Sequence, residues 1–140
     1  RIPVGAAPGG PPTDAVVPAP APADLRIVLG PRQDWFTAAA LVTLTNVAWR
    51  VRSESDRIGI RLQGPRLERA VPGELPSEPT LPGALQVPPD GRPILLGPDA
   101  PVTGGYPVVA VVVDADLDRA AQLRAGDPVR FAAHRAGLSP

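Results

Sequence analysis

The 21 prolines of this 140-residue chain limit the length of each helix or strand, because proline lacks an N–H group and interrupts both. Seven prolines precede residue 23, among alanines and glycines and without an apolar period of 2 or 3.6 residues. This stretch predicts a Pro/Ala-rich linker over residues 1–24. From residue 25 the prolines stand between short apolar runs. The sequence therefore predicts one globular domain over residues 25–133, followed by a frayed tail over residues 134–140.

The apolar runs after residue 24 have the length and pattern of short strands. Some alternate apolar and polar residues, as half-buried strands do, whereas the run at residues 107–113 is almost continuously apolar. Asp90 and Gly91 form a turn signal between two neighbouring runs, which predicts a hairpin. Strands are expected at residues 25–29, 49–52, 58–62, 84–87, 92–96, 107–113 and 129–131.

Two segments have the composition of helices, and both are short. Thr37 is a suitable N-cap for a helix over residues 38–45, and Asp116 for one over residues 117–123. Helices this short cannot form the crossovers of a parallel α/β sheet. Residues 63–83 hold five prolines and three glycines, which predicts a long loop of the kind that often carries function. The pattern predicts a mainly β fold, a closed or partly closed β barrel with two short helices.

The chain has 14 arginines and no lysine, against a total of 14 aspartates and glutamates. The formal net charge of zero gives no electrostatic basis for binding nucleic acid or an anionic membrane. The longest apolar run is too short to cross a bilayer. Without lysine the chain cannot carry a Gly-x-x-x-x-Gly-Lys phosphate loop or a biotinyl-lysine. Cysteine is absent, which fits the cytoplasmic location that we expect.

The first candidate for a binding site is the segment Thr103-Gly104-Gly105-Tyr106. Paired glycines let backbone N–H groups approach a ligand closely and accept dihedral angles closed to other residues. Such N–H groups hold a carboxylate or a developing oxyanion, and the two hydroxyl groups would add directional contacts. The alternative is a tight turn before a core strand, with Tyr106 as a packing residue.

Three polar side chains are further candidates for ligand contacts. Glu78, in the long loop, could bind an amide or ureido N–H group or transfer a proton as a catalytic group, or it could be a solvated glutamate. Gln86 offers a donor and an acceptor, which suits a lactam or urea-like ligand, unless it is an outward-facing surface residue. Arg57 could clamp a carboxylate, or form a structural ion pair with Asp56, Glu54 or Glu78.

No pattern of residues favours a metal site. His134 is the single histidine and lies in the predicted tail, so neither a catalytic triad nor a histidine-based metal site is expected. Asp114, Asp116 and Asp118 resemble a metal-binding run. A helix cap at Asp116, with neighbours favoured by the helix dipole, explains these aspartates more simply.

Three segments, in this order and spacing, resemble a known family. The first covers residues 55–65 and opens with Ser55-Asp56-Arg57. The second covers residues 74–78 and 83–94, and includes Ser77-Glu78 and Gln86. The third opens with Thr103-Gly104-Gly105-Tyr106-Pro107 and continues to residues 115–119. Together with the segment at residues 30–36, they resemble the C-terminal part of the biotin-dependent carboxyltransferase family. This family, which is related to urea amidolyase, includes the C-type subunit of 5-oxoprolinase and the second subunit of allophanate hydrolase.

This resemblance implies a cyclophilin-like β barrel over residues 25–133 that forms the C-terminal half of a longer protein. It also implies a related partner subunit of the carboxyltransferase type (the B-type subunit of 5-oxoprolinase or the first subunit of allophanate hydrolase). The chain departs from the family pattern at Pro79, where a glycine commonly follows Ser-Glu, and at Val102, where a second threonine is common. Gly97-Pro98 stands where Ala-Asp is more usual. These departures lie beside the candidate residues and leave the identity of a substrate open.

The function that the resemblance implies is that of a non-autonomous subunit in an ATP-dependent 5-oxoprolinase or an allophanate- or urea-type amide hydrolase. The domain would contribute half of a site for a small amide, lactam or urea-like substrate, with Glu78, Gln86 and the Thr103-to-Tyr106 segment orienting it. No cofactor is expected on this chain, since ATP, and any biotin, would be bound by other parts of the complex. The alternative is a regulatory module that sequesters its partner subunit and catalyses nothing.

Overall fold

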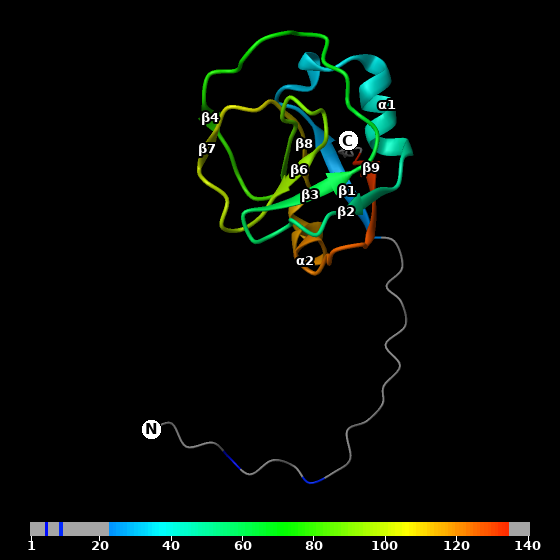
Figure 1. The fold of residues 1–140 in the computed structure, drawn as a ribbon, viewed down its shortest axis with the longest axis vertical. Helices are drawn as coiled ribbons and strands as arrows, with labels where there is room; N and C mark the ends of the chain where they lie inside the picture. Colours follow the sequence, from blue (N-terminus) through cyan, green and yellow to red (C-terminus); the bar gives the residue numbers. More distant parts are fainter. Residues whose placement is uncertain (1–4, 6–8, 10–22, 135–140) are drawn as a thin grey trace, which may run out of the picture.

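The computed structural model describes residues 5, 9 and 23–134 and shows a closed β barrel with short helices at its margins (Figure 1). Seven strands form the barrel, in the order β1-β8-β5-β6-β3-β2-β9. The mainly β barrel predicted from the sequence is confirmed. The barrel strands are β1 (Ala23–Leu29), β2 (Trp49–Val51), β3 (Gly59–Gln63), β5 (Ala84–Gln86), β6 (Ile94–Leu96), β8 (Val108–Val112) and β9 (Pro128–Ala133).

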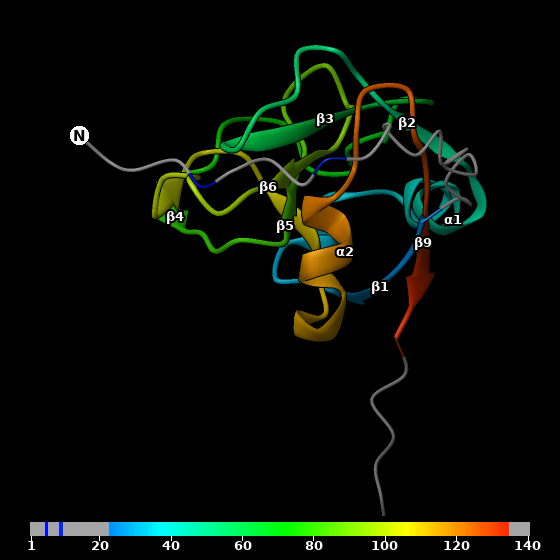
Figure 2. The same ribbon diagram turned by 90° about the horizontal axis from the view of Figure 1, so that it is seen from below.

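The barrel closes through β1 and β9, which run parallel to each other; each of the other neighbouring pairs in the barrel is antiparallel. Figure 2 shows β1 and β9 side by side. Antiparallel neighbours can be joined by short turns, which explains how a chain with so many prolines closes a sheet. The predicted hairpin around Asp90-Gly91 is confirmed, with Leu85 opposite Leu95 and with Gly91 at a φ of 76° in the turn.

Two additional two-residue strands, β4 (Glu78–Pro79) and β7 (Thr103–Gly104), pair into a ribbon outside the barrel. We call this pair the β4–β7 ribbon. The long loop predicted over residues 63–83 contains β4, and Phe36 pairs with Arg69 in its first half as an isolated bridge. The Arg69 guanidinium also donates to the carbonyl oxygens of Gly73 and Val87 at 3.1 and 3.0 Å. The loop is therefore held against the barrel.

Apolar side chains form two separate clusters because successive residues of a strand face opposite sides of the sheet. The main cluster fills the barrel and includes Leu85 and Trp49, both 0 % exposed. A smaller cluster of Ala84, Leu96 and Val108 lies apart from it. Since Ala84 and Gln86 flank Leu85 on β5, both face the outer wall of the barrel. The outer wall therefore has a small buried region of its own.

The helices are α1 (Ala38–Asn46) and α2 (Leu117–Ala121), and single 3-10 turns precede them at Gln33–Trp35 and Asp114–Asp116. Thr37 caps α1 as predicted, because its side chain accepts a hydrogen bond from the Ala40 N–H at 3.1 Å. Helix α1 packs against β9, and α2 packs against β1 (Figures 1 and 2). None of the described helices has the length and apolar composition that a membrane span requires.

The predicted domain limits fall partly outside the described residues. Of the expected linker over residues 1–24, only positions 5, 9, 23 and 24 are described, and β1 already begins at Ala23. Of the expected tail over residues 134–140, only His134 is described, and its N–H donates to the Ile27 carbonyl oxygen at 2.7 Å. The first strand thus begins two residues earlier than its apolar run, because backbone pairing with β9 extends past the apolar side chains.

The prediction that Asp116 caps the second helix is wrong. Its side chain makes no capping hydrogen bond and is 2 % exposed. Both carboxylate oxygens instead accept hydrogen bonds from Arg26: the backbone N–H and Nε donate to Oδ2 at 2.8 and 2.9 Å, and Nη2 donates to Oδ1 at 2.8 Å. This pairing ties the start of α2 to β1. Within residues 23–134, no three His, Cys, Asp or Glu side chains gather as a metal site.

With asparagine in place of Asp116, the free energy of unfolding should fall less between neutral and acidic pH than it does in the wild type. The hydrogen bonds from Arg26 hold the pKa of Asp116 well below its usual range, against the opposing effect of burial. A carboxylate with a lowered folded-state pKa stabilises the fold above its unfolded pKa of about 3.9, and this stability is lost as the pH falls further. Urea unfolding at pH 7 and pH 3 measures the effect. Asp118→Asn, at an exposed aspartate in the first turn of α2, is the control, and equal pH profiles for both variants would contradict the assignment.

Candidate functional site

The β4–β7 ribbon brings together two candidate segments that are far apart in the sequence. Glu78 pairs with Gly104, and Pro79 pairs with Thr103. The ribbon continues for one further residue, where the Thr80 N–H donates to the Val102 carbonyl oxygen at 2.8 Å. Figure 1 shows β4 and β7 beside each other at the edge of the barrel. The predicted loop carboxylate and the predicted glycine segment therefore belong to one local structure.

Gln86 lies on the outer wall beneath this ribbon and is 8 % exposed. Its amide lies against Gly104, where a Cβ atom would collide with Gln86 Nε2 and would be 3.4 Å from Cδ. Among residues 23–134, no group forms a hydrogen bond with this amide, yet no fully buried polar atom lacks a partner. The amide must therefore keep a narrow opening to solvent. An almost buried donor and acceptor with no protein partner can serve a ligand.

Glu78 is paired with an arginine that the sequence did not single out. Arg32 Nε donates to Glu78 Oε2 at 3.1 Å, and Arg32 Nη2 donates to Oε1. The hydrogen bonds from Arg32 lower the pKa of Glu78, and burial opposes this shift. The carboxylate is thus ionised at neutral pH and can accept a hydrogen bond from a ligand. Such a pKa makes it a weak base, so orientation of a ligand N–H group suits it better than proton transfer.

Arg32 is held in position by the backbone around it. The Arg32 N–H donates to the Val108 carbonyl oxygen at 2.9 Å, and the Gly30 N–H donates to that of Val109 at 3.0 Å. The segment at residues 30–36 resembles the family entry into this domain, which is the one sequence signal that points to Arg32. Nothing in the local pattern indicates that its partner is Glu78, 46 residues further along the chain.

The two glycines of the Thr103-to-Tyr106 segment do not have the special backbone dihedral angles expected from the sequence. Neither Gly104 nor Gly105 has a positive φ; the described glycines that do are Gly30, Gly73, Gly83, Gly91 and Gly126. The predicted need for special dihedral angles is therefore wrong. Gly104 is instead needed for space, because Gln86 occupies the position of its missing side chain. At Gly105, a Cβ atom would be 3.5 Å from the Leu75 carbonyl oxygen, which is an ordinary contact. Thr103 and Tyr106 are exposed at the two ends of the segment, and Tyr106 is 44 % exposed.

Arg57 does not share the contacts of these residues. Its Nε and Nη2 donate to the Asp99 carboxylate at 2.6 and 3.3 Å. An ion pair is therefore present, but with Asp99 rather than with the Asp56, Glu54 or Glu78 considered from the sequence. Asp56 instead accepts hydrogen bonds from the N–H groups of Ile58 and Gly59 at 2.9 and 3.0 Å. The guanidinium fork of Arg57 is already occupied by a carboxylate of the protein.

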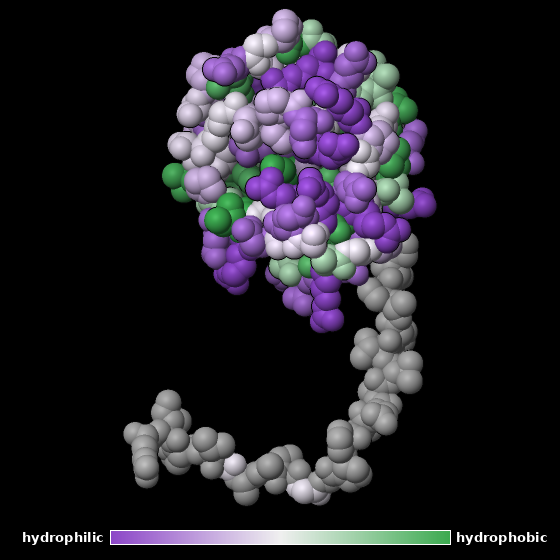
Figure 3. Space-filling view, viewed as in Figure 1, coloured by the Kyte–Doolittle hydropathy of each residue, from purple (hydrophilic) through white to green (hydrophobic). Residues whose placement is uncertain are grey.

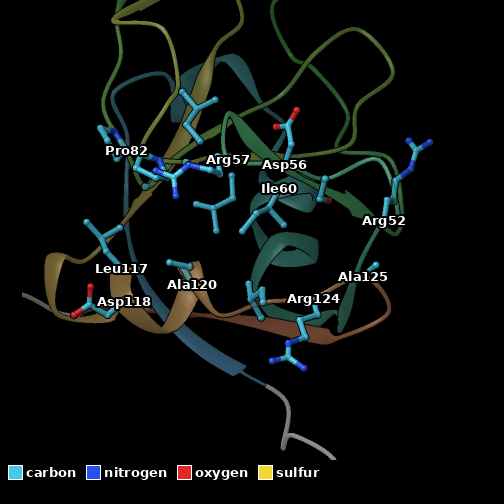
Figure 4. A pocket seen from close by; sticks show the side chains of 18 residues that line it. Arg52, Asp56, Arg57, Ile60, Pro82, Leu117, Asp118, Ala120, Arg124 and Ala125 are labelled. Carbon is cyan, nitrogen blue, oxygen red and sulfur yellow. The ribbon is translucent and has the colours of Figure 1, made fainter. Parts of the chain in front are cut away.

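Arg57 instead borders a pocket of about 540 Å³ between α2 and strands β3 and β6 (Figure 4). Ile60, Leu117 and Ala120 contribute to its apolar wall, and Arg124 lies at its border. No Gln86, Glu78 or Gly104 atom lines this pocket. The structure thus separates the predicted site residues into a group at the β4–β7 ribbon and Arg57 elsewhere.

Exposed apolar side chains flank the ribbon. Val102 is 78 % exposed and Leu81 is 53 % exposed, and both lie next to the residues that pair in the ribbon. The face of the molecule in Figure 3 is mostly polar, with apolar residues in small separate groups. Both residues lie near the place where the Gln86 amide lies against Gly104 of the ribbon, which we call the recess.

The fold and this recess define a class: a closed β-barrel domain whose outer wall carries a buried amide beside an arginine-paired carboxylate. Within that class, the chain belongs to the family described as "Carboxyltransferase domain, subdomain A and B", whose model matches residues 1–133. The resemblance seen in the sequence is confirmed. The chain is 41 % identical over 107 residues to the C-type subunit of 5-oxoprolinase from Escherichia coli (strain K12), and 49 % identical over 85 residues to the protein of the same name from Haemophilus influenzae.

These matches cover 76 % and 61 % of this chain, but 34 % and 28 % of the two relatives. The chain therefore spans about a third of the length of the curated relatives it matches. Among solved structures, the urea amidolyase of K. lactis is similar, with a TM-score of 0.77 and 26 % identity over 86 % of this chain and 8 % of that one. In each of these relatives, the matched region is thus a small part of a much larger protein.

Proposed function

We propose that this chain is part of a 5-oxoprolinase- or urea-amidolyase-type assembly and contributes half of a small-molecule site shared with a related partner subunit. The observation that carries the proposal is the Gln86 amide, which is 8 % exposed, has no hydrogen-bond partner among residues 23–134, and lies next to the ribbon that holds Glu78. Kinship with the C-type subunit of 5-oxoprolinase supports the same type of assembly.

The chemistry of the recess suits a ligand that has a C=O group and an N–H group on one edge. The Gln86 amide can donate to the C=O group, and the ionised Glu78 carboxylate can accept from the N–H group. A lactam such as 5-oxoproline, an amide or a urea derivative has both functions. A ligand that lacks the C=O group would leave the Gln86 donor unpaired in the closed site, and one that lacks the N–H group would leave Glu78 with Arg32 alone; both losses disfavour binding.

In this proposal, the chain's own residues bind and orient the substrate. Arg32 keeps Glu78 ionised and fixed, and the ribbon places it next to Gly104. ATP, and biotin where the assembly uses it, would be bound by other subunits and would supply the activation of the carbonyl group. The exposed Val102 and Leu81 beside the recess suit a partner subunit that closes the second half of the site.

The test is turnover by the reconstituted assembly, with this chain in its full-length protein and the partner subunits present. Glu78→Ala should lower ATP-dependent substrate turnover about 100-fold, because the ligand N–H group loses its acceptor and its orientation. Glu74→Ala, an exposed glutamate in the same loop, should leave turnover unchanged. Full activity of the Glu78 variant in a correctly assembled complex would remove Glu78 from the site.

The same experiment decides between this proposal and a regulatory module. Tight co-purification with the partner, with no turnover of 5-oxoproline or of urea-type substrates, would favour a protein that sequesters its partner. In that case Val102→Asp should abolish co-purification, whereas Glu78→Ala should leave it intact.

A further inference from the structure

We propose that Gly104 is a positioning residue for Gln86: the absence of a side chain at residue 104 determines where the Gln86 amide lies. This inference rests on the proposed function in so far as Gln86 contacts a ligand. Its structural part, the dependence of the amide on residue 104, stands independently. It assigns to Gly104 a role different from a backbone cradle for an anion.

The contacts of the missing side chain carry the argument. A Cβ atom at residue 104 would collide with Gln86 Nε2, and its other near neighbour is Thr80 Cγ2 at 3.3 Å. The obstacle is thus the end of a flexible side chain. Gly97 is a useful contrast, because there a Cβ atom would collide with the backbone of Arg57. Gly104→Ala should therefore move the Gln86 amide, whereas a side chain at residue 97 must move the main chain.

The backbone of Gln86 cannot follow its displaced amide. Gln86 is paired with Ile94 of β6 on one side and with Val108 of β8 on the other, so the strand is fixed within the barrel. The amide lies beside the small apolar cluster of Ala84 and Val108, which offers no hydrogen-bond partner. A side chain at residue 104 therefore forces a new rotamer on Gln86 and turns its donor away from the ribbon.

This displacement changes the spacing between two groups that the ligand must contact together. Glu78 lies opposite Gly104 in the ribbon and is held by Arg32, so it stays in place when Gln86 moves. A ligand with fixed C=O and N–H groups can then reach one of the two side chains but not both. The residue at position 104 thereby determines how far apart the C=O and N–H groups of a ligand must be to contact both side chains.

The Gln86 amide can be observed directly, because the chain contains only four glutamines and one asparagine. In a ¹H–¹⁵N spectrum, the side-chain NH₂ pair that disappears in Gln86→Ala is the signal of Gln86. We expect Gly104→Ala to shift this pair strongly and Gly105→Ala to leave it in place, since residue 105 has room for a Cβ atom. An unmoved Gln86 signal in folded Gly104→Ala would overturn the inference.

A thermodynamic cycle covers the case in which Gly104→Ala is too unstable for spectroscopy. If the collision is with the amide, Gly104→Ala should lower Tm in the wild-type background and have little effect in the Gln86→Ala background. An equal loss in both backgrounds would overturn the inference.

Turnover separates this inference from the proposed function. In the reconstituted assembly, Gly104→Ala should raise KM about 10-fold in the wild-type background and leave it unchanged in the Gln86→Ala background. If Gln86→Ala has no effect on turnover although Gly104→Ala shifts the Gln86 signal, the positioning is upheld and the proposed ligand contact is wrong. If Gln86→Ala lowers turnover but the signal does not respond to residue 104, the contact is upheld and the positioning is wrong.

Discussion

Trp49→Ala should lower the free energy of unfolding by about 3–5 kcal/mol, which is the usual cost of deleting a large buried side chain. Trp49 is 0 % exposed and stands at the start of β2, between β3 and β9. Its indole Nε1 donates to the Leu44 carbonyl oxygen of α1 at 3.1 Å. The ring also fills the space beside Gly64, where a Cβ atom would lie 2.7 Å from Trp49 Cζ3. Alanine would therefore leave a cavity and an unpaired carbonyl group at the junction of helix and barrel.

A loss of this size is a large fraction of the total stability of a typical domain, about 5–15 kcal/mol. Urea titration followed by far-UV circular dichroism measures it without depending on tryptophan fluorescence. The matched control is Trp35→Ala, because Trp35 is only partly buried and packs at the margin of the same core. We expect a clearly smaller loss for the control. Equal losses for the two variants would show that Trp49 has no special role in joining α1 to the barrel.

The barrel could be predicted from the sequence because its signals are local. Alternation within a strand, the Asp90-Gly91 turn and the Thr37 cap each depend on residues within a few positions of one another, and the structure contains all three. The β4–β7 ribbon has no such signal. Each of its strands is two residues long, too short for any period, and it forms because barrel closure brings residues 78 and 104 together.

The partners of the charged residues could not be predicted for the same reason. Arg57 has acidic neighbours in the sequence, but its partner is Asp99, 42 residues away. Asp116 stands where a helix cap is expected, but Arg26 lies 90 residues earlier in the sequence and takes both of its oxygens. The ion-pair partners of Arg57 and Asp116 therefore depend on which distant residues the folded barrel brings together. A site that depends on such pairs, like Glu78 with Arg32, can be only half recognised before the fold is known.

Gly104→Val should abolish substrate turnover by the reconstituted assembly, with a loss of at least about 100-fold, as expected when reacting groups are displaced by about 1 Å. A Cβ atom alone collides with the Gln86 amide, and the two additional methyl groups would also crowd Thr80, whose Cγ2 is 3.3 Å from the Cβ position. The branched side chain would therefore remove the Gln86 amide from the recess and separate the ribbon from the outer wall of β5. The barrel itself should persist, because β4 and β7 are not among its strands.

Steady-state turnover and thermal unfolding of the same protein samples test this expectation together. Turnover should fall in the order wild type, Gly104→Ala, Gly104→Val, following the volume added against Gln86, while Tm changes much less than in Trp49→Ala. Gly105→Ala should behave as wild type, because a methyl group there meets only the Leu75 carbonyl oxygen at 3.5 Å. Wild-type turnover by Gly104→Val would show that the recess beneath the ribbon has no part in the reaction. A collapse of Tm with the loss of activity would instead make the ribbon a structural support of the barrel rather than one wall of a site.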